Sequence, residues 1–262
     1  MATIVIDAGH GYKTLGKRCM KKLDPNQTRE WSLNDRIADK VEELLKGYEN
    51  CNVLRTDDTT GIKDVSLSKR VKSANAIDAD IIVSIHHNAG IKGGSGGGAV
   101  VYHYNNIAGK VRAKRLYDAV VAQTGLKGNR ANPIAVGNSL YIIKKTVAPC
   151  LLLENGFMDS TVDVPIILSE AHATKTAQGI VNFLAAELKL VKKAVVTPTV
   201  KTYTVGQVIS LKAGAKYYNG KSIPSWVLKK TLYYRGKNKN GIIFSTLKTG
   251  AITGVVKPEY VI

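Results

Sequence analysis

Three apolar segments of the sequence each end in a residue that can bind or activate a metal ion. Short apolar runs of this kind are typical of buried strands. The residues are His10, His86 and Glu154, which close the runs that begin at Ile4, Ile81 and Leu151. Ligands collect beyond the carboxyl ends of parallel strands, so we expect the three side chains to meet at one edge of a sheet. The pattern predicts the site of a metal-dependent hydrolase.

A catalytic zinc ion typically takes two histidines and a carboxylate from the protein and leaves a fourth position for water. His10 and His86 supply the two imidazoles. Glu30 is the best candidate for the carboxylate, because it stands at the start of an apolar-periodic stretch that predicts a helix. Glu154 is then left to take a proton from the attacking water and to pass it to the leaving nitrogen.

Other polar residues near these segments receive different interpretations. Asp24, in a Pro-containing loop, is an alternative carboxylate ligand, whereas Asp7 is expected to orient His10. His87 should point to the opposite side of its strand from the predicted ligand, which favours packing or a substrate contact. A buried structural role is the alternative for any single histidine at a strand end. Structural or surface roles are expected for His103 and His172.

The ordered motifs resemble those of the zinc-dependent N-acetylmuramoyl-L-alanine amidases of bacterial autolysins and phage endolysins. The matching blocks are Asp7–Gly11, the isolated Glu30, Ser84–Ala89, Leu153–Phe157 and a helix-like segment over residues 67–75. The resemblance covers about residues 1–190. It implies one zinc ion held by His10, Glu30 and His86, with Glu154 as the catalytic residue. Asn88 and Asn155 are candidates for substrate binding.

The resemblance implies cleavage of the amide bond between N-acetylmuramic acid and the L-alanine of the stem peptide. Two alternatives remain at this point. A zinc peptidase of the stem peptide would use the same chemistry on a different bond, and a wall-binding protein would not cleave at all. Expected partners are peptidoglycan and the anionic polymers of a Gram-positive wall.

Charge and composition predict two domains in these 262 residues. The net charge is +18, and residues 197–262 carry 11 Lys or Arg against one acid, Glu259. A polar, Pro-interrupted stretch predicts a linker over 191–201 between a catalytic domain, 1–190, and a wall-binding domain, 202–262. The positive charge suits an anionic wall polymer. Without a recognised nucleic-acid-binding motif, we do not expect a nucleic-acid partner.

The first domain alternates apolar runs with helical periodicity, which predicts a mostly parallel sheet covered by helices. Helices are expected around residues 30–47, 65–77, 106–124 and 169–189, and strands near 3–8, 52–56, 81–88, 98–104, 139–143 and 150–154.

The second domain has short β-type runs at 207–211, 231–234, 241–245 and 252–256, which predict a small all-β barrel. It resembles the bacterial Src-homology-3-like modules that bind cell walls. Tyr217, Tyr218 and Trp226 are candidates for wall binding. Tyr233 and Tyr234 could join them, but in so small a domain about half of these aromatics should belong to the core.

The sequence lacks an apolar run of transmembrane length and begins without a signal-like segment, so no membrane insertion is expected. Three cysteines without CxxC spacing argue against a disulfide framework or a thiolate zinc cluster. These features predict synthesis in a bacterial cytoplasm. For a bacteriophage endolysin, they predict holin-mediated release to the wall and cytolysis of the host.

Overall fold

The structure is a computed structural model that describes residues 1–194 and 202–262. The chain divides into two compact units, Met1–Lys193 and Ala194–Ile262. Most of the predicted linker, residues 195–201, lies outside the described residues. Within the described part of the chain, no helix has both the length and the apolar character needed to cross a membrane.

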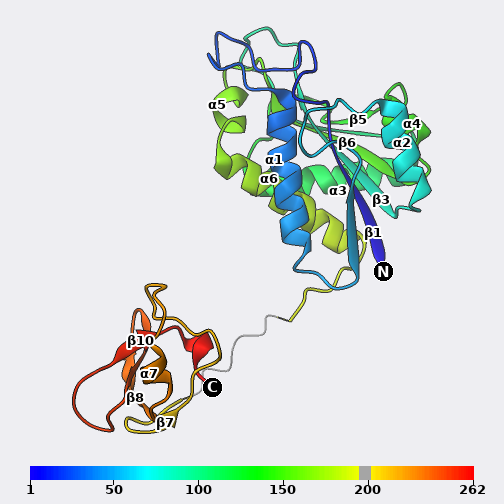
Figure 1. Ribbon diagram of the computed structural model, residues 1–262. Coiled ribbons are helices and arrows are strands. Elements are labelled where there is room, and N and C mark those ends of the chain that lie inside the picture. The colour runs from blue at the N-terminus through cyan, green and yellow to red at the C-terminus, as the bar shows by residue number, and fades with distance from the viewer. Residues whose placement is uncertain (195–201) are drawn as a thin grey trace. The chain divides into compact units, whose positions relative to one another are not determined.

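A six-stranded, mostly parallel sheet forms the centre of the first unit (Figure 1). Its strand order is β2-β1-β3-β6-β4-β5, and only the β4–β6 pair is antiparallel. The strands are β1 (Ala2–Ala8), β2 (Cys51–Arg55), β3 (Ile81–Asn88), β4 (Ala99–His103), β5 (Ile134–Val136) and β6 (Cys150–Phe157). The predicted α/β architecture with a mostly parallel sheet is therefore confirmed.

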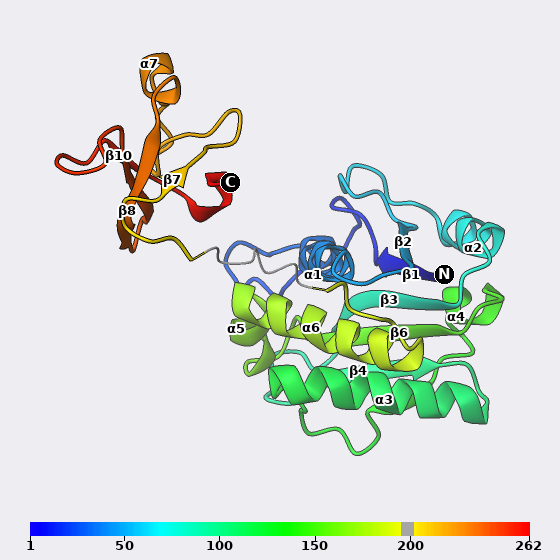
Figure 2. The same ribbon diagram turned by 90° about the horizontal axis from the view of Figure 1, so that it is seen from below.

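Helices cover both faces of this sheet (Figures 1 and 2). They are α1 (Glu30–Leu45), α2 (Leu67–Ala76), α3 (Ile107–Thr124), α4 (Tyr141–Lys145), α5 (Asp163–Ile167) and α6 (Glu170–Glu187). The larger core lies between the sheet and α1, α3 and α6. A smaller core lies on the other face, under α2 and α4.

Strand β1 shows how the sequence specifies this sandwich. Ile4 and Ile6 belong to the larger core, whereas Val5 between them belongs to the smaller one. Successive side chains of a strand point to opposite faces, so a strand covered on both faces needs apolar residues at every position. The helix partner obeys its own period, because Ile37, Val41 and other buried residues of α1 recur every three or four positions.

The strand predicted at residues 139–143 is wrong. Tyr141–Lys145 forms α4, and the nearby edge strand is β5, which follows Pro133. Ile142 and Ile143 are both buried in the smaller core. Five residues with two adjacent isoleucines do not distinguish a strand from one turn of buried helix, so packing decides the structure.

The second unit contains a four-stranded antiparallel sheet of order β10-β9-β8-β7. Its elements are β7 (Val208–Ile209), α7 (Ser225–Leu228), β8 (Leu232–Asn238), β9 (Gly241–Ser245), β10 (Gly254–Val256) and the 3-10 helix η1 (Pro258–Tyr260). Val227, Phe244 and Val256 are fully buried at its centre. The likeness to a Src-homology-3-like barrel stays a prediction.

Candidate functional site

The carboxyl ends of β1, β3 and β6 lie next to one another, and they carry His10, His86 and Glu154. His86 in β3 pairs in register with Glu154 in β6. On the other side of β3, the Gly9 amide donates a hydrogen bond to the Ile85 carbonyl at 3.0 Å, which carries His10 to the same edge. His10, His86 and Glu154 line one cleft.

Glu30, the first residue of α1, places its carboxylate between the two imidazoles. Its Oε1 atom lies 3.0 Å from Nδ1 of His86 and 3.3 Å from Nε2 of His10. The backbone N–H of His87 also donates to Oε1, at 3.2 Å. The side chain is 1% exposed. A carboxylate in the first turn is favoured by the helix dipole, but here it also faces the strand ends.

The spacing of these atoms fits a tetrahedral metal ion. One ligand atom each from His10, Glu30 and His86 lies within 4.8 Å of the others. Two ligands about 2.1 Å from a tetrahedral zinc ion are separated by about 3.4 Å, close to the distances found here. Nε2 of His10 and Oε2 of Glu30 are buried and have no hydrogen-bond partner among the described residues. The three residues can therefore hold a cation.

Electrostatics keep the Glu30 carboxylate ionised. Burial alone would raise its pKa, but the imidazoles of His86 and His10 lower the pKa well below the ordinary value. An ionised carboxylate is the form that binds a metal. Gly9 is required for this close assembly, because a Cβ atom there would lie only 2.0 Å from the His86 ring.

His10 has a left-handed backbone, with φ of 70°, which is costly for a residue other than glycine. Buried side chains hold the three carbonyls around this turn. Arg70 donates to the carbonyls of Ala8 at 2.6 Å and His10 at 2.8 Å, and Asn34 donates to the carbonyl of Gly9 at 3.1 Å. Arg70 is 2% exposed and Asn34 is fully buried. The surrounding protein thus fixes the direction of the His10 side chain.

Asp7 reaches the His10 turn through Arg70, which is compatible with the expected orienting role. Its carboxylate binds the Arg70 guanidinium at 2.7 Å and accepts hydrogen bonds from Thr56 and Ser84, both at 2.7 Å. Burial would raise the pKa of Asp7, but Arg70 and the hydroxyl donors lower it below its ordinary value. Arg70 links this buried anion to the His10 turn.

Glu154 differs from Glu30 in its surroundings. It is half-buried, and its Oε2 atom has no hydrogen-bond partner among the described residues. Loss of hydration raises its pKa to about 7, and the negative charge of Glu30 acts in the same direction. A carboxyl group with such a pKa exchanges a proton readily near neutral pH.

The two asparagines proposed for substrate binding occupy different environments. Asn155 is 1% exposed, and its Nδ2 atom donates to the His86 carbonyl at 3.1 Å. Its burial and this hydrogen bond make Asn155 a support for the strand that carries His86, and its role in substrate binding stays a prediction. Asn88 is half-buried and lines a pocket of about 300 Å³ beside Glu154, so it remains a candidate for substrate contact.

The remaining histidines and Asp24 lie outside the metal-binding cluster. His87 is buried and donates from Nδ1 to Oδ1 of Asn34 at 2.8 Å; burial lowers its pKa to about 3, so the ring is neutral. Asp24 accepts hydrogen bonds from backbone amides of its own loop. His103 and His172 are both buried.

A cleft of about 520 Å³ opens at the predicted metal ligands and extends toward α2 and α4. Lys17 lines this cleft and also the smaller pocket that holds Asn88, so the two hollows meet at Lys17 and Glu154. Tyr141 lines the larger hollow and is 41% exposed. Two hollows therefore adjoin the Glu154 carboxylate.

Sequence reasoning did not assign site roles to Lys17, Asn34 or Arg70. Asn34 and Arg70 are polar residues on the buried faces of α1 and α2, and that position in an amphipathic helix is the signal that could have found them. Lys17 lies in a loop, and no periodic pattern predicts where a loop side chain lies.

The aromatic candidates of the second unit separate into exposed and packed residues. Trp226 is 58% exposed and Tyr218 is 46% exposed. Tyr217 is half-buried and stacks on Phe244, with ring centroids 6.3 Å apart, and Tyr234 is buried. Tyr217 therefore contributes to the core as well as to the surface.

Comparisons with known proteins identify relatives of the first unit. The family model described as N-acetylmuramoyl-L-alanine amidase matches residues 4–186. The amidase CwlM of Bacillus licheniformis is 32% identical over 198 residues, which cover 74% of this chain and 72% of CwlM. The endolysin of Bacillus phage SPP1 is 28% identical over 194 residues, which cover 72% of this chain and 67% of that protein.

The fold also matches solved structures. The catalytic domain of CwlV, an N-acetylmuramoyl-L-alanine amidase from Bacillus (Paenibacillus) polymyxa var. colistinus, is 30% identical. The match has a TM-score of 0.64 and covers 72% of this chain and 99% of that domain. The family match, residues 4–186, runs from β1 into α6 and so includes His10, Glu30, His86 and Glu154. The chain therefore belongs to the N-acetylmuramoyl-L-alanine amidase family and is a peptidoglycan hydrolase with that activity.

Proposed function

We propose that this amidase uses one zinc ion held by His10, Glu30 and His86, and that Glu154 is its catalytic acid and base. The observation that supports the proposal is the cluster of three ligand atoms within 4.8 Å, beside a carboxyl group of raised pKa. Zinc, when bound, would supply Lewis acidity toward the amide carbonyl and lower the pKa of water.

In this mechanism Glu154 transfers the proton. Its Oε2 atom is unpartnered, so it can accept a proton from the attacking water without breaking an existing hydrogen bond. The same carboxyl group then protonates the departing alanine nitrogen, which makes the amine a better leaving group. A pKa of about 7 suits both steps, because neither the acid nor the base form is strongly favoured at neutral pH.

The two hollows that meet at Glu154 fit a substrate that continues on both sides of the cleaved bond. The amide joins a glycan to a peptide, so one hollow would receive the muramic acid and the other the stem peptide. Lys17 lines both hollows, and its ammonium group lies 3.7 Å from Oε2 of Glu30. It can attract anionic groups of the substrate to the reacting centre.

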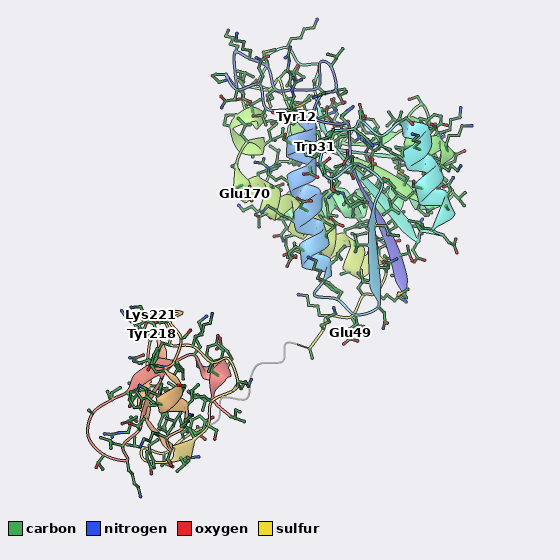
Figure 3. The ribbon with its side chains drawn as sticks, in the orientation of Figure 1. Tyr12, Trp31, Glu49, Glu170, Tyr218 and Lys221 are labelled. Carbon is green, nitrogen blue, oxygen red and sulfur yellow. The ribbon has the colours of Figure 1, made fainter. Side chains whose placement is uncertain are left out.

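We further propose that the second unit binds the cell wall. Residues 197–262 hold 11 Lys or Arg against one acid, so this unit attracts anionic polymers of a Gram-positive wall. Tyr218 lies in the turn between Lys216 and Ser222, close to Lys221 (Figure 3). Tyr218 and Trp226 are both exposed, and each can stack on a sugar ring.

Similarity to the endolysin of phage SPP1 supports a role in phage lysis. In that role the enzyme would be made in the host cytoplasm and reach the wall after holin-mediated release. Expression with and without a holin in a Gram-positive host tests this part separately. Lysis of the host without holin, at the same rate, would overturn it.

Digestion of purified Gram-positive peptidoglycan tests the chemistry. Mass spectrometry should find intact stem peptides with free N-terminal L-alanine and glycan chains with free lactyl carboxylates. A strong chelator should stop the release, and zinc should restore it. New reducing ends would indicate a glycosidase, and new amines inside the stem peptide would indicate a peptidase.

A further inference from the structure

Most of the net positive charge of the catalytic unit lies in one loop, residues 11–29, which we call the basic loop. Residues 1–193 contain 27 Lys or Arg and 19 Asp or Glu, a net charge of +8. The basic loop alone contributes +5 of this charge, from six cations and one acid. The cations are Lys13, Lys17, Arg18, Lys21, Lys22 and Arg29. The rest of the unit holds 21 Lys or Arg and 18 Asp or Glu and contributes the remaining +3.

These cations are available to an external anion. Five of the six are exposed, and Arg29 is half-buried. Within the described residues, only Lys17 has an ion-pair partner, Glu30 at 3.7 Å. The one acid of the loop, Asp24, is 3% exposed and accepts hydrogen bonds from the amides of Asn26 and Thr28. The negative charge of Asp24 is therefore buried inside the loop and does not neutralise the exposed cations.

The loop backbone is fixed, so the points from which the charged side chains extend have defined positions. Arg18 and Arg29 face each other in an antiparallel bridge. The amide of Cys19 bonds to the Thr28 carbonyl, and the amide of Met20 bonds to the Met158 carbonyl, both at 2.9 Å. Cys19 is 1% exposed and anchors the loop in a small apolar cluster. A preorganised array of like charges binds an anion without ordering a flexible chain first.

The loop also forms a cleft of about 380 Å³ in which every charged lining residue is basic. Arg18 and Arg29 line it together with Tyr12, and the Arg29 guanidinium lies 6.0 Å from the Tyr12 ring. Tyr12 in turn packs edge-on against Trp31 in the first turn of α1 (Figure 3). Guanidinium groups beside hydrogen-bonding side chains are well suited to phosphate oxygens.

We infer that the basic loop binds the phosphodiester backbone of an anionic polymer attached to the wall glycan. The inference rests on the proposed function, which places the substrate in a cell wall. The loop starts one residue after His10 and ends one residue before Glu30, so it borders the reacting centre. Six cations are more than one stem-peptide carboxylate needs, whereas a polymer presents a charge at each repeat. The catalytic unit would thus dock beside the bond that it cuts, independently of the second unit.

Two full-length variants with equal charge change test the inference. The loop variant changes Lys13, Arg18, Lys21 and Lys22 to Gln. The control variant changes Lys69, Lys110, Lys145 and Lys175 to Gln; these four exposed lysines lie on α2, α3, α4 and α6, outside the loop. Substrates are Gram-positive walls that carry the polymer, the same walls after hydrofluoric acid removes phosphodiesters, and a soluble muramyl-peptide fragment.

At low salt, the loop variant should lose about tenfold or more in kcat/KM on polymer-bearing walls, and the control variant much less. All three proteins should act equally on stripped walls and on the soluble fragment, and the difference should disappear at high salt. Equal losses by both variants on polymer-bearing walls would overturn the inference. The inference would also be overturned if the loop variant alone lost binding to single-stranded DNA but kept full activity on walls, because the loop would then be a nucleic-acid-binding surface. Inactivity of the unmodified enzyme on the fragment would instead refute the proposed function.

Discussion

Replacing Arg70 with Met should separate the stability of the fold from the geometry of the metal site. Arg70 binds the Asp7 carboxylate at 2.7 Å and the carbonyls of Ala8 and His10 at 2.6 and 2.8 Å. Without the guanidinium, Asp7 would remain buried with only the hydroxyls of Thr56 and Ser84 as donors. Breaking a buried ion pair in this way costs about 3–5 kcal/mol, a large part of the stability of a typical domain.

A second variant removes the uncompensated charge of Asp7 but does not restore the missing hydrogen bond to the His10 carbonyl. In Asp7→Asn/Arg70→Met both charges are absent, so we expect the double variant to recover about 2 kcal/mol or more of the lost stability. The carbonyl of His10 still lacks its donor, and the left-handed turn is then held mainly through Asn34 at Gly9. Zinc affinity should therefore stay about 10- to 100-fold below that of the unmodified enzyme.

Urea unfolding of the zinc-free proteins and zinc competition against a chromophoric chelator measure the two effects. Arg36→Met is a matched control, because Arg36 also donates to backbone carbonyls, those of Ile167 and Leu168, but not to the His10 turn. It should lower stability and leave zinc affinity almost unchanged. If the double variant bound zinc as tightly as the unmodified enzyme, the proposed link from Arg70 to His10 would be refuted.

Four further outcomes follow from the site. Glu154→Gln should keep its zinc and its fold but lose about 10²- to 10⁴-fold in turnover, measured on purified peptidoglycan; loss of zinc as well would make Glu154 a ligand. Glu30→Ala should lower the bound zinc, measured by elemental analysis. Full zinc content in this variant would show that Glu30 is not the third ligand. Because Glu154 must be deprotonated to accept a proton and its pKa is raised to about 7, kcat/KM should fall as the pH drops below about 7; bound zinc would move this acid limb toward lower pH, and a profile flat down to pH about 4 would contradict the assignment. A protein truncated after Lys193 should still cut soluble fragments but act much more slowly on whole cells, in a turbidity assay, because it lacks the second unit.

The positions of the proposed site residues could be predicted because they depend on short-range patterns. Apolar runs placed His10, His86 and Glu154 at strand ends, and the rule that parallel strands share an edge brought them together. The helix beginning at Glu30 could also be predicted, because its apolar residues repeat at helical spacing. Both inferences use only residues that are close in sequence and the repeat of side-chain direction in regular structure, about 3.6 residues in a helix and 2 in a strand.

The supports of the site could not be predicted, because they join residues that are distant in sequence. Arg70 reaches the His10 carbonyl across 60 positions, and Asn155 reaches the His86 carbonyl across 69. The bond from Arg70 further depends on the left-handed turn at His10, which no local preference indicates for histidine. The misassigned strand near residue 141 has a related cause, since the packing of Ile142 and Ile143 in the smaller core decided the structure.

The two site glutamates show how environment, and not residue type, divides the chemistry. Glu30 is almost fully buried, yet the imidazoles beside it keep its pKa low and its carboxylate ionised. Glu154 faces the cleft with one unpartnered oxygen, and loss of hydration together with the charge of Glu30 raises its pKa to about 7. A permanently ionised group suits a metal ligand, whereas a group that titrates near neutrality suits proton transfer. In the proposed mechanism, the charge of ionised Glu30 thus helps the neighbouring Glu154 to take up the proton that it later donates.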